Sequence, residues 1–316
     1  CARFIPWEIS NEGGNWSYNY HLVIRPMEPR NLQWFLSVAS RMRGCLMFLI
    51  GSAIYTLELV ASFPKDQVSE DVSYGQILQA VDVPSAIDGD RVDFSTRFEE
   101  VAEQLPQIFK AWFDDAEALT VVMNAYKEVL LNDGAYEESL FLSIVQVLEH
   151  FHGVLFPKEN RYLDRSNWKS FIDCVQPYLA QALENVGCTS DDKKEVLLKR
   201  LGSLNEFSFM SRLKKLINEI PEPKLMPILN NPEDRDRGID DFARKLDKTR
   251  NFLIHHEQKH AAEALTGRQL RRTISSCWAI LTYWLARSLG FSEQMAGNIA
   301  YRAQYAFFRV GRKSVL

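Results

Sequence analysis

Apolar residues recur at helical spacing in almost every segment from about Leu105 to the C-terminus, and few folds accommodate such a pattern. In 107–132 and 136–156, an apolar residue returns every three or four positions, so each segment has one broad apolar face. Further helices are predicted at 167–186, 191–203, 207–219, 239–256, 268–289 and 292–308. The proline-rich stretch 221–238 is expected to interrupt the series. The pattern therefore predicts a bundle of helices around a shared core.

The first 105 residues have a mixed pattern. Residues 16–25 alternate aromatic or β-branched positions with polar ones, which favours a strand, and 31–51 has the spacing of a helix. A second strand is predicted at 54–62, and the polar, turn-rich stretches after it indicate loops. We therefore expect a mostly α protein, in which a smaller α+β domain at 1–105 precedes an all-α helical bundle at 106–316.

Composition excludes several classes of protein. The net charge is −4 and the pI is about 6.0, so the chain is not a polycation that coats nucleic acid, and any contact with RNA must be local.

Scattered cysteines without a C-x-x-C pair indicate reduced thiols and hence a cytoplasmic location. The most apolar window, 45–62, is interrupted by polar residues, which argues against a membrane span. Because the numbering starts at Cys1 and not at Met, we expect it to begin inside a longer natural sequence.

The stretch RNFLIHHEQKH, residues 250–260, contains two overlapping chemical patterns. One is H-E-x-x-H, from His256 through Glu257 to His260, a spacing that places two zinc ligands on one face of a helix. A zinc peptidase of this kind would need a third ligand, which is not evident downstream, and the intervening lysine would place an ammonium beside the metal. The other pattern is R-N-x-x-x-H, which begins at Arg250.

The second pattern supplies the groups that metal-free RNA cleavage needs. Such cleavage requires a base for the ribose 2′-OH, an acid for the leaving oxygen and positive charge on the phosphate. Histidine transfers protons near neutral pH, and arginine binds two phosphate oxygens at once. At about 100° per residue, Asn251 and His255 share a helix face, whereas Arg250 lies about 140° from His255. We therefore expect Asn251 to orient the imidazole, and Arg250 to reach round the helix or to work with the motif of a partner subunit.

RNFLIHH resembles the R-x(4–6)-H motif of HEPN ribonucleases, and the preceding DDFARKLDKT resembles the ApeA-like HEPN group of anti-phage proteins. The earlier segment EESLFLSIVQVLEHFH is similar to a helix of that group that carries an inward glutamate. The resemblance covers roughly 106–310. It implies a homodimer whose two motifs form one composite site, and RNA cleavage that needs no metal or other cofactor and leaves a 2′,3′-cyclic phosphate.

The resemblance also implies roles for individual residues. Arg250 and His255 would be the catalytic pair, Asn251 the polar residue after the arginine, and Glu149 the acid that holds Arg250 in place. His256 also satisfies the allowed spacing, so the identity of the catalytic imidazole stays open. His255 is favoured because it shares a helix face with Asn251.

Simpler structural roles are open for the charged residues of this set. Arg250 could be a surface cation that pairs with Asp247, one turn earlier on the same helix. Glu149 lies in an otherwise apolar run, where it is either partnered in the interior or placed on a solvent-facing stripe. The basic stretch 193–216 could line an RNA path, but a solvated face is expected.

The expected function is that of a toxin-like endoribonuclease in abortive anti-phage defence. Its partners would be RNA and a second copy of the chain, with no membrane. The domain at 1–105 is expected to sense or restrain, and a phage-derived or nucleotide trigger is a candidate partner for it. The main alternative is a non-catalytic HEPN-like helical module that dimerises or binds RNA, and the zinc peptidase through His256, Glu257 and His260 is the other.

Overall fold

The computed structural model describes most of the chain, in two parts. The residues described are 2–12, 15–24, 26–28, 30–52, 54, 59–60, 76–77, 96–114, 116–131, 136–187, 190, 195–197, 200–201, 203–229, 233–256 and 258–310. The chain forms two compact units, Cys1–Leu46 and Met47–Leu316.

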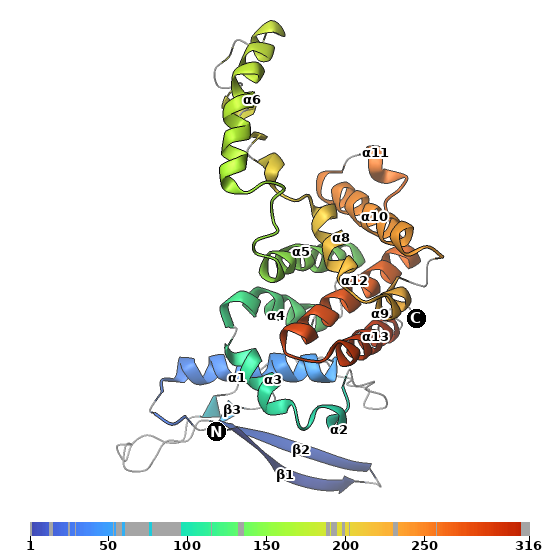
Figure 1. Ribbon diagram of the computed structural model, residues 1–316. Coiled ribbons are helices and arrows are strands. Elements are labelled where there is room, and N and C mark those ends of the chain that lie inside the picture. The colour runs from blue at the N-terminus through green and yellow to red at the C-terminus, as the bar shows by residue number, and fades with distance from the viewer. Residues whose placement is uncertain are drawn as a thin grey trace. The chain divides into compact units, whose positions relative to one another are not determined.

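The first unit contains a long β-hairpin. Strand β1 (Ala2–Glu12) pairs antiparallel with β2 (Asn15–Ile24), and the register shifts between Pro6 and Glu8. Proline has no N–H to donate to a ladder, so an irregularity accommodates it there. Helix α1 (Leu32–Ile50) follows the hairpin in the chain and continues past the end of the first unit (Figure 1).

The second unit is mostly helical, as the sequence predicts (Figure 1). The strands β3 (Leu59–Val60) and β4 (Gln76–Ile77) form a short antiparallel pair. The helices that follow in the chain are α2 (Phe98–Val101), α3 (Leu105–Asp114), α4 (Ala116–Leu131), α5 (Glu137–Leu155) and α6 (Arg165–Asn185). A 3-10 turn, η2 (Ser203–Asn205), precedes α8 (Phe209–Asn218), α9 (Glu222–Ile228), α10 (Arg235–His255), α11 (Gln258–Ala261), α12 (Gly267–Ser288) and α13 (Glu293–Val310).

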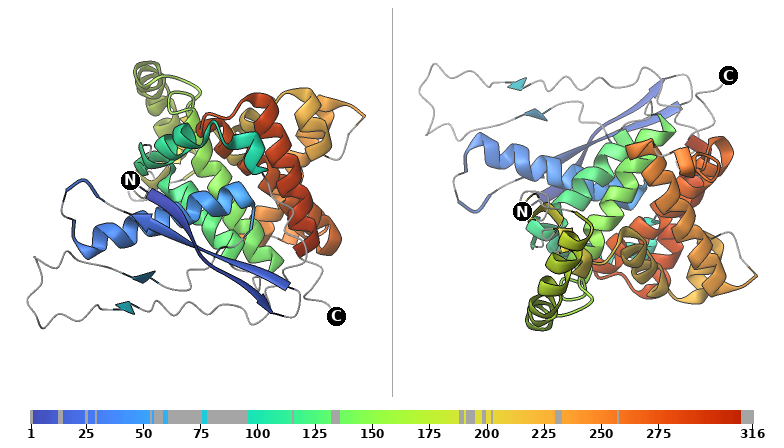
Figure 2. Two further views of the ribbon diagram at one scale, coloured as in Figure 1. Left: turned by 90° about the horizontal axis from the view of Figure 1, so that it is seen from below. Right: turned by 90° about the horizontal axis from the view of Figure 1, so that it is seen from above.

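Helix α12 forms the centre of the helical core. It packs against α5 and α13, and α13 runs beside it in both views of Figure 2. Trp278 of α12 stacks on Tyr126 of α4 with 4.1 Å between ring centroids, and both rings are buried. Because α12 is buried on several sides, its apolar residues are not confined to one stripe. Three helices carry the site: α5 packs against α12, and α8 packs against both α5 and α10.

The compact units do not divide at the predicted residue, Leu105. The ring of Phe48, near the end of α1, lies 5.7–6.3 Å from the rings of Trp112, Tyr126 and Phe291. The carbonyl of Leu49 also accepts hydrogen bonds from the backbone and the hydroxyl of Thr96, at 3.0 and 2.7 Å. These contacts make the end of α1 part of the helical unit. A separate regulatory domain at 1–105 stays a prediction.

Two of the helix predictions are wrong. The segment 107–132 is two helices, since α3 ends at Asp114 and α4 begins at Ala116. The proline-rich stretch 221–238 does not simply interrupt the helices, because it contains α9. Its prolines at 221 and 223 lie at the N-cap and in the first turn, where no N–H is needed. The predicted helix at 191–203, the strand at 54–62 and the loops after it lie largely outside the described residues.

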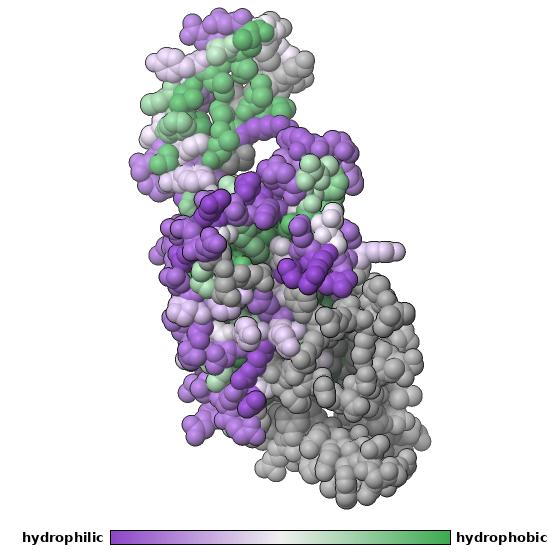
Figure 3. All heavy atoms as spheres, turned by 90° about the vertical axis from the view of Figure 1, so that its right-hand side faces the viewer, coloured by the Kyte–Doolittle hydropathy of each residue, from purple (hydrophilic) through white to green (hydrophobic). Residues whose placement is uncertain are grey.

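Helix α6 is amphipathic, but no other described element buries its apolar side chains. All of its residues are described and none is buried, and Phe171 and Tyr178 are among its exposed aromatic side chains. Hydrophobic residues are visible over this helix in the upper part of Figure 3. Among the described helices, none has the length and apolarity needed to cross a membrane.

Candidate active site

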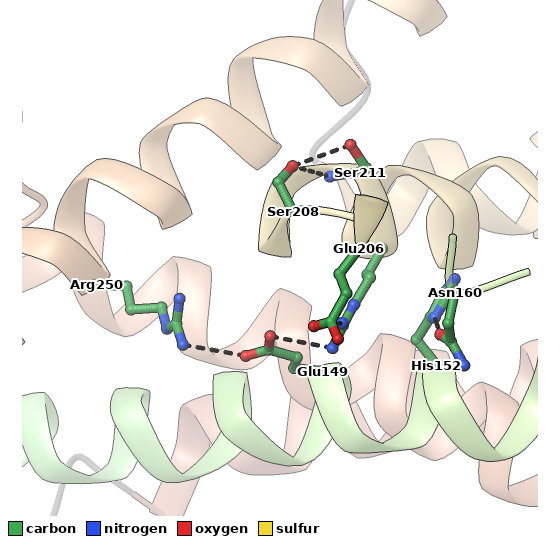
Figure 4. Close-up of polar contacts among 8 residues, drawn as sticks. Glu149, His152, Asn160, Glu206, Ser208, Ser211 and Arg250 are labelled. Atoms are coloured by element: carbon green, nitrogen blue, oxygen red, sulfur yellow. Dashed lines mark hydrogen bonds and ion pairs between the residues drawn. The ribbon is translucent and has the colours of Figure 1, made fainter. Parts of the chain in front are cut away.

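A single carboxylate, that of Glu149 on α5, binds two arginines from two other helices. Glu149 Oε2 accepts a hydrogen bond from Arg250 Nη2 at 3.1 Å, and Oε1 accepts one from Arg212 Nη1 at 3.3 Å. Figure 4 shows the side chains of Glu149 and Arg250 pointing toward each other across the space between α5 and α10. Since α8 contacts both α5 and α10, Arg212 enters the same space from a third helix.

The position of Glu149 on α5 explains why it needs these partners. The helix buries an apolar face that includes Val145, Leu148 and Phe151, and Glu149 lies at its margin with 24% of its side chain exposed. A carboxylate that loses much of its water must be compensated by charge or hydrogen bonds. Two guanidinium groups supply both, so Glu149 is a partnered carboxylate at the edge of the core and does not lie on a solvent-facing stripe.

Arg250 is fixed by two contacts. Its guanidinium carbon lies 5.0 Å from the centre of the Phe209 ring on α8, a distance at which the ring face attracts the cation. Together with the Glu149 bond, this contact sets the direction of a side chain that keeps 29% of its surface exposed. The alternative role for Arg250, a surface pair with Asp247, is not what the structure shows, because Arg250 binds Glu149 and the Asp247 carboxylate accepts a hydrogen bond from Asn251 Nδ2 at 3.3 Å.

Asn251 therefore does not make the predicted contact with the His255 imidazole. Its amide was expected to orient the imidazole of His255, one turn later, but it bonds to the acid one turn earlier. Both directions are i,i+4 contacts on one helix face, and a carboxylate oxygen is a stronger acceptor for an amide N–H than an imidazole nitrogen.

The two histidines of the motif lie at the surface where α10 ends. His255 is the last residue of the helix and is exposed. His256 is the C-cap residue in the left-handed conformation, with φ of 52°, and its N–H donates to the carbonyl of Phe252 at 2.8 Å. A non-glycine residue in this conformation is uncommon and ends a helix. Neither imidazole makes a hydrogen bond or ion pair with another described residue.

This helix end removes the geometric basis of the zinc pattern. His256 lies beyond α10 and His260 lies in the separate α11, so the two are not neighbours on one continuous helix. Glu257 lies outside the described residues. Among the residues that are described, no three His, Cys, Asp or Glu side chains are grouped so as to hold a metal ion.

Arg212 has a second, looser acidic neighbour in Glu206. The distance from Arg212 Nη2 to Glu206 Oε2 is 3.9 Å, and the Glu206 side chain is 56% exposed. The backbone at Glu206 is held independently, since it forms a β-bridge with Arg161 and the adjacent Asn205 carbonyl accepts from the N–H of Tyr162 at 3.0 Å. The carboxylate of Glu206 can therefore move without a change in the backbone.

A buried histidine lies further along α5. His152 is fully buried, its Nδ1 lies 3.1 Å from Asn160 Oδ1, and burial lowers its pKa. Its Nε2 has no hydrogen-bond partner among the described residues. The ring lies against those of Phe156 and Phe207. This packing and the lowered pKa favour a neutral imidazole with a structural role.

Sequence reasoning missed Arg212 and Phe209. Arg212 belongs to the basic stretch 193–216, which was expected to be a solvated face, and the carboxylate it binds is 63 residues away in the chain. Periodicity assigns Phe209 to an apolar face but gives no reason to place a guanidinium over it. The available signal was the local density of arginine and lysine on a predicted amphipathic helix.

The site therefore combines fixed cations with a free imidazole at the surface. Arg250 and Arg212 are held at one carboxylate but remain partly accessible, an arrangement suited to binding an anion. His255 is near Arg250 in sequence and open to a substrate. A chain of this design could bind a phosphate group and transfer a proton beside it.

Part of the chain matches a known protein family. The family model described as Apea-like HEPN matches residues 142–295, a range that includes Glu149, Arg212, Arg250 and His255. No curated protein and no solved structure matches the chain.

Proposed function

Residues 142–295 form an Apea-like HEPN domain, and on this basis we propose that the protein is a metal-independent endoribonuclease that acts as a toxin-like effector in anti-phage defence. HEPN domains are generally ribonucleases that dimerise and bind RNA, which supports a nuclease with a role in defence. The observation that carries the proposal is the Arg250–Glu149 contact, which fixes the arginine of the R-N-x-x-x-H motif while His255 stays exposed.

The proposed reaction is transfer of the phosphate to the neighbouring ribose oxygen. The 2′-oxygen attacks phosphorus as a base removes its proton, the bond from phosphorus to the 5′-oxygen breaks, and an acid protonates that leaving oxygen. The products are a 2′,3′-cyclic phosphate and a 5′-hydroxyl end. Arg250 would bind the phosphate oxygens and stabilise the charge that grows on them in the transition state.

The reaction requires two proton transfers, which favours a dimer. His255 is the preferred imidazole of each chain, and two copies of the motif that face each other would supply one base and one acid. This composite site is part of the proposal, as is regulation by residues 1–105. His256 is the less suited imidazole, because its left-handed backbone already serves to end α10.

RNA cleavage in excess EDTA tests the proposal. We expect wild-type protein to cleave RNA under these conditions and to leave a cyclic phosphate, and Arg250→Ala and His255→Ala to lose at least about a hundredfold in rate. His256→Gly is the matched control, since glycine adopts the same φ without strain and removes only the second imidazole. Loss of activity in His256→Gly with full activity in His255→Ala would identify His256, and not His255, as the catalytic histidine. RNA binding without cleavage by any form, including a form from phage-challenged cells, would favour the non-catalytic module.

A further inference from the structure

Arg212 binds the same carboxylate, Glu149, as the motif arginine Arg250. Arg212 and Arg250 each donate one hydrogen bond to a different oxygen of Glu149, at 3.3 and 3.1 Å. One carboxylate carries a single negative charge, so it balances only one of the two guanidinium groups. The other guanidinium charge, beside the motif arginine, is met only by the looser 3.9 Å pair of Arg212 with Glu206.

The only other acid paired with Arg212 in the described residues does not bind it tightly. The 3.9 Å separation between Arg212 Nη2 and Glu206 Oε2 is longer than a hydrogen bond, and most of the Glu206 side chain is in solvent. The Arg212 side chain is only 20% exposed, and its Nε has no hydrogen-bond partner among the described residues. A half-buried guanidinium with an incomplete set of acceptors is prepared to bind an anion.

We propose that Arg212 is a second phosphate-binding group of the RNase site, and that the carboxylate of Glu206 leaves it when an RNA phosphate binds. The inference rests on the proposed function. Glu149 lies between the two guanidinium groups and reduces their mutual repulsion, which lets both approach one anion or two successive phosphates of a strand. Since the backbone of Glu206 is held by Arg161 and Tyr162, its side chain can turn away without disturbing α8.

A purely structural role for Arg212 would have different consequences. A structural ion pair would affect stability but not the salt dependence of RNA binding. A phosphate contact releases condensed counterions, so its loss reduces the slope of log affinity against log salt concentration by about 0.7 for a single strand. The salt slope therefore separates the two roles.

The test uses the full chain and a short, labelled 2′-O-methyl RNA, which binds but cannot be cleaved because its 2′-oxygen has no proton. Fluorescence anisotropy would give the affinity between about 50 and 200 mM KCl. We expect Arg212→Gln and Arg250→Gln each to weaken binding about tenfold and to reduce the slope by about 0.7. Arg235→Gln is the matched control and should change neither quantity. Arg235 also lies in the second unit and is 27% exposed, and its buried Nε has no hydrogen-bond partner within the described part of the chain. Its guanidinium binds the Asn218 carbonyl and lies 3.5 Å from Asp236, so its contacts differ from those of Arg212.

Glu206→Gln supplies a second test that does not depend on the stability of an arginine variant. Removal of the competing carboxylate should tighten RNA binding several-fold, whereas Glu219→Gln, which removes an acid paired with Lys215, should not. An unchanged salt slope in Arg212→Gln together with unchanged affinity in Glu206→Gln would overturn the inference. If the salt slope still falls in Arg250→Gln, the proposed RNase site stands even though the role of Arg212 is refuted. Failure of the wild-type protein to bind the RNA at all would refute both the role of Arg212 and the proposed RNase site.

Discussion

Replacement of Glu149 by Gln should destabilise the helical unit by about 2 kcal/mol. The substitution keeps the shape but removes the charge that two guanidinium groups share. A hydrogen bond to a charged group contributes about 1.5–3 kcal/mol, and Glu149 accepts two. The three side chains keep 20–29% of their surface exposed, so water replaces part of each contact and the lower end of the range applies to the pair. The glutamine oxygen can still accept from one arginine, but its NH₂ group would face the other.

Urea unfolding followed by circular dichroism would measure this loss. We expect a lower midpoint with an unchanged slope, and a melting temperature lower by about 4–8 °C for a unit of this size. Glu159→Gln is the control, because Glu159 is 53% exposed and its 3.1 Å contact with Lys215 is an ordinary surface pair that should cost less than about 0.5 kcal/mol. If the two variants lose the same small amount, Glu149 does not hold the arginines and the interpretation of the site fails. A double-mutant cycle of Glu149→Gln with Arg250→Gln should also be non-additive.

Three other substitutions probe the support of the site and of the fold. Phe209→Leu should retain the fold but reduce RNA cleavage several-fold, because the guanidinium above the ring loses a contact of about 1 kcal/mol; unchanged kinetics would show that the ring is not needed. Thr249→Val should cost about 1–3 kcal/mol in urea unfolding, since the hydroxyl accepts from the buried N–H of Leu265 at 3.0 Å, and a neutral effect would contradict that bond. The Arg302 guanidinium lowers the pKa of Glu100 to about 2 from its ordinary value near 4.5. The ion pair therefore stabilises the folded protein fully above about pH 4.5, and this stabilisation is lost as the pH falls from 4.5 toward 2. The stability difference between wild type and Glu100→Gln should therefore shrink below about pH 4.5, and a constant difference would exclude the linkage.

Local sequence rules predicted the helices of the site well. The periodic segments at 136–156 and 207–219 are close to the observed bounds of α5 and α8, because burial of one apolar face determines both. The start of α10 at Arg235 depends on Asp234, whose carboxylate accepts from the N–H of Arg237 at 2.7 Å. The sequence prediction began this helix four residues late, since the proline-rich stretch before it was interpreted as an interruption.

The contacts between helices were less predictable. The expected partnership of Glu149 and Arg250 came from family resemblance, and the structure brings these side chains together. No local rule relates Arg212 to Glu149, because which arginines meet a carboxylate depends on how α8 packs between α5 and α10. The place of Asn251 was misjudged because two i,i+4 partners compete for one amide, and spacing alone does not rank them.

The separation of the site residues along the chain has a consequence for protein synthesis. Arg212 and Arg250 are 63 and 101 residues beyond Glu149, so the helices from α3 to α5 leave the ribosome long before α10 does. While a chain that cleaves RNA is still being translated, ribosomal RNA and its own message are the RNA nearest to it. On the proposed function, an unfinished chain carries the glutamate but neither the motif arginine nor its histidines, and it cannot damage the ribosome that makes it. On that proposal, the order of residues in the chain would protect the ribosome during synthesis of the protein.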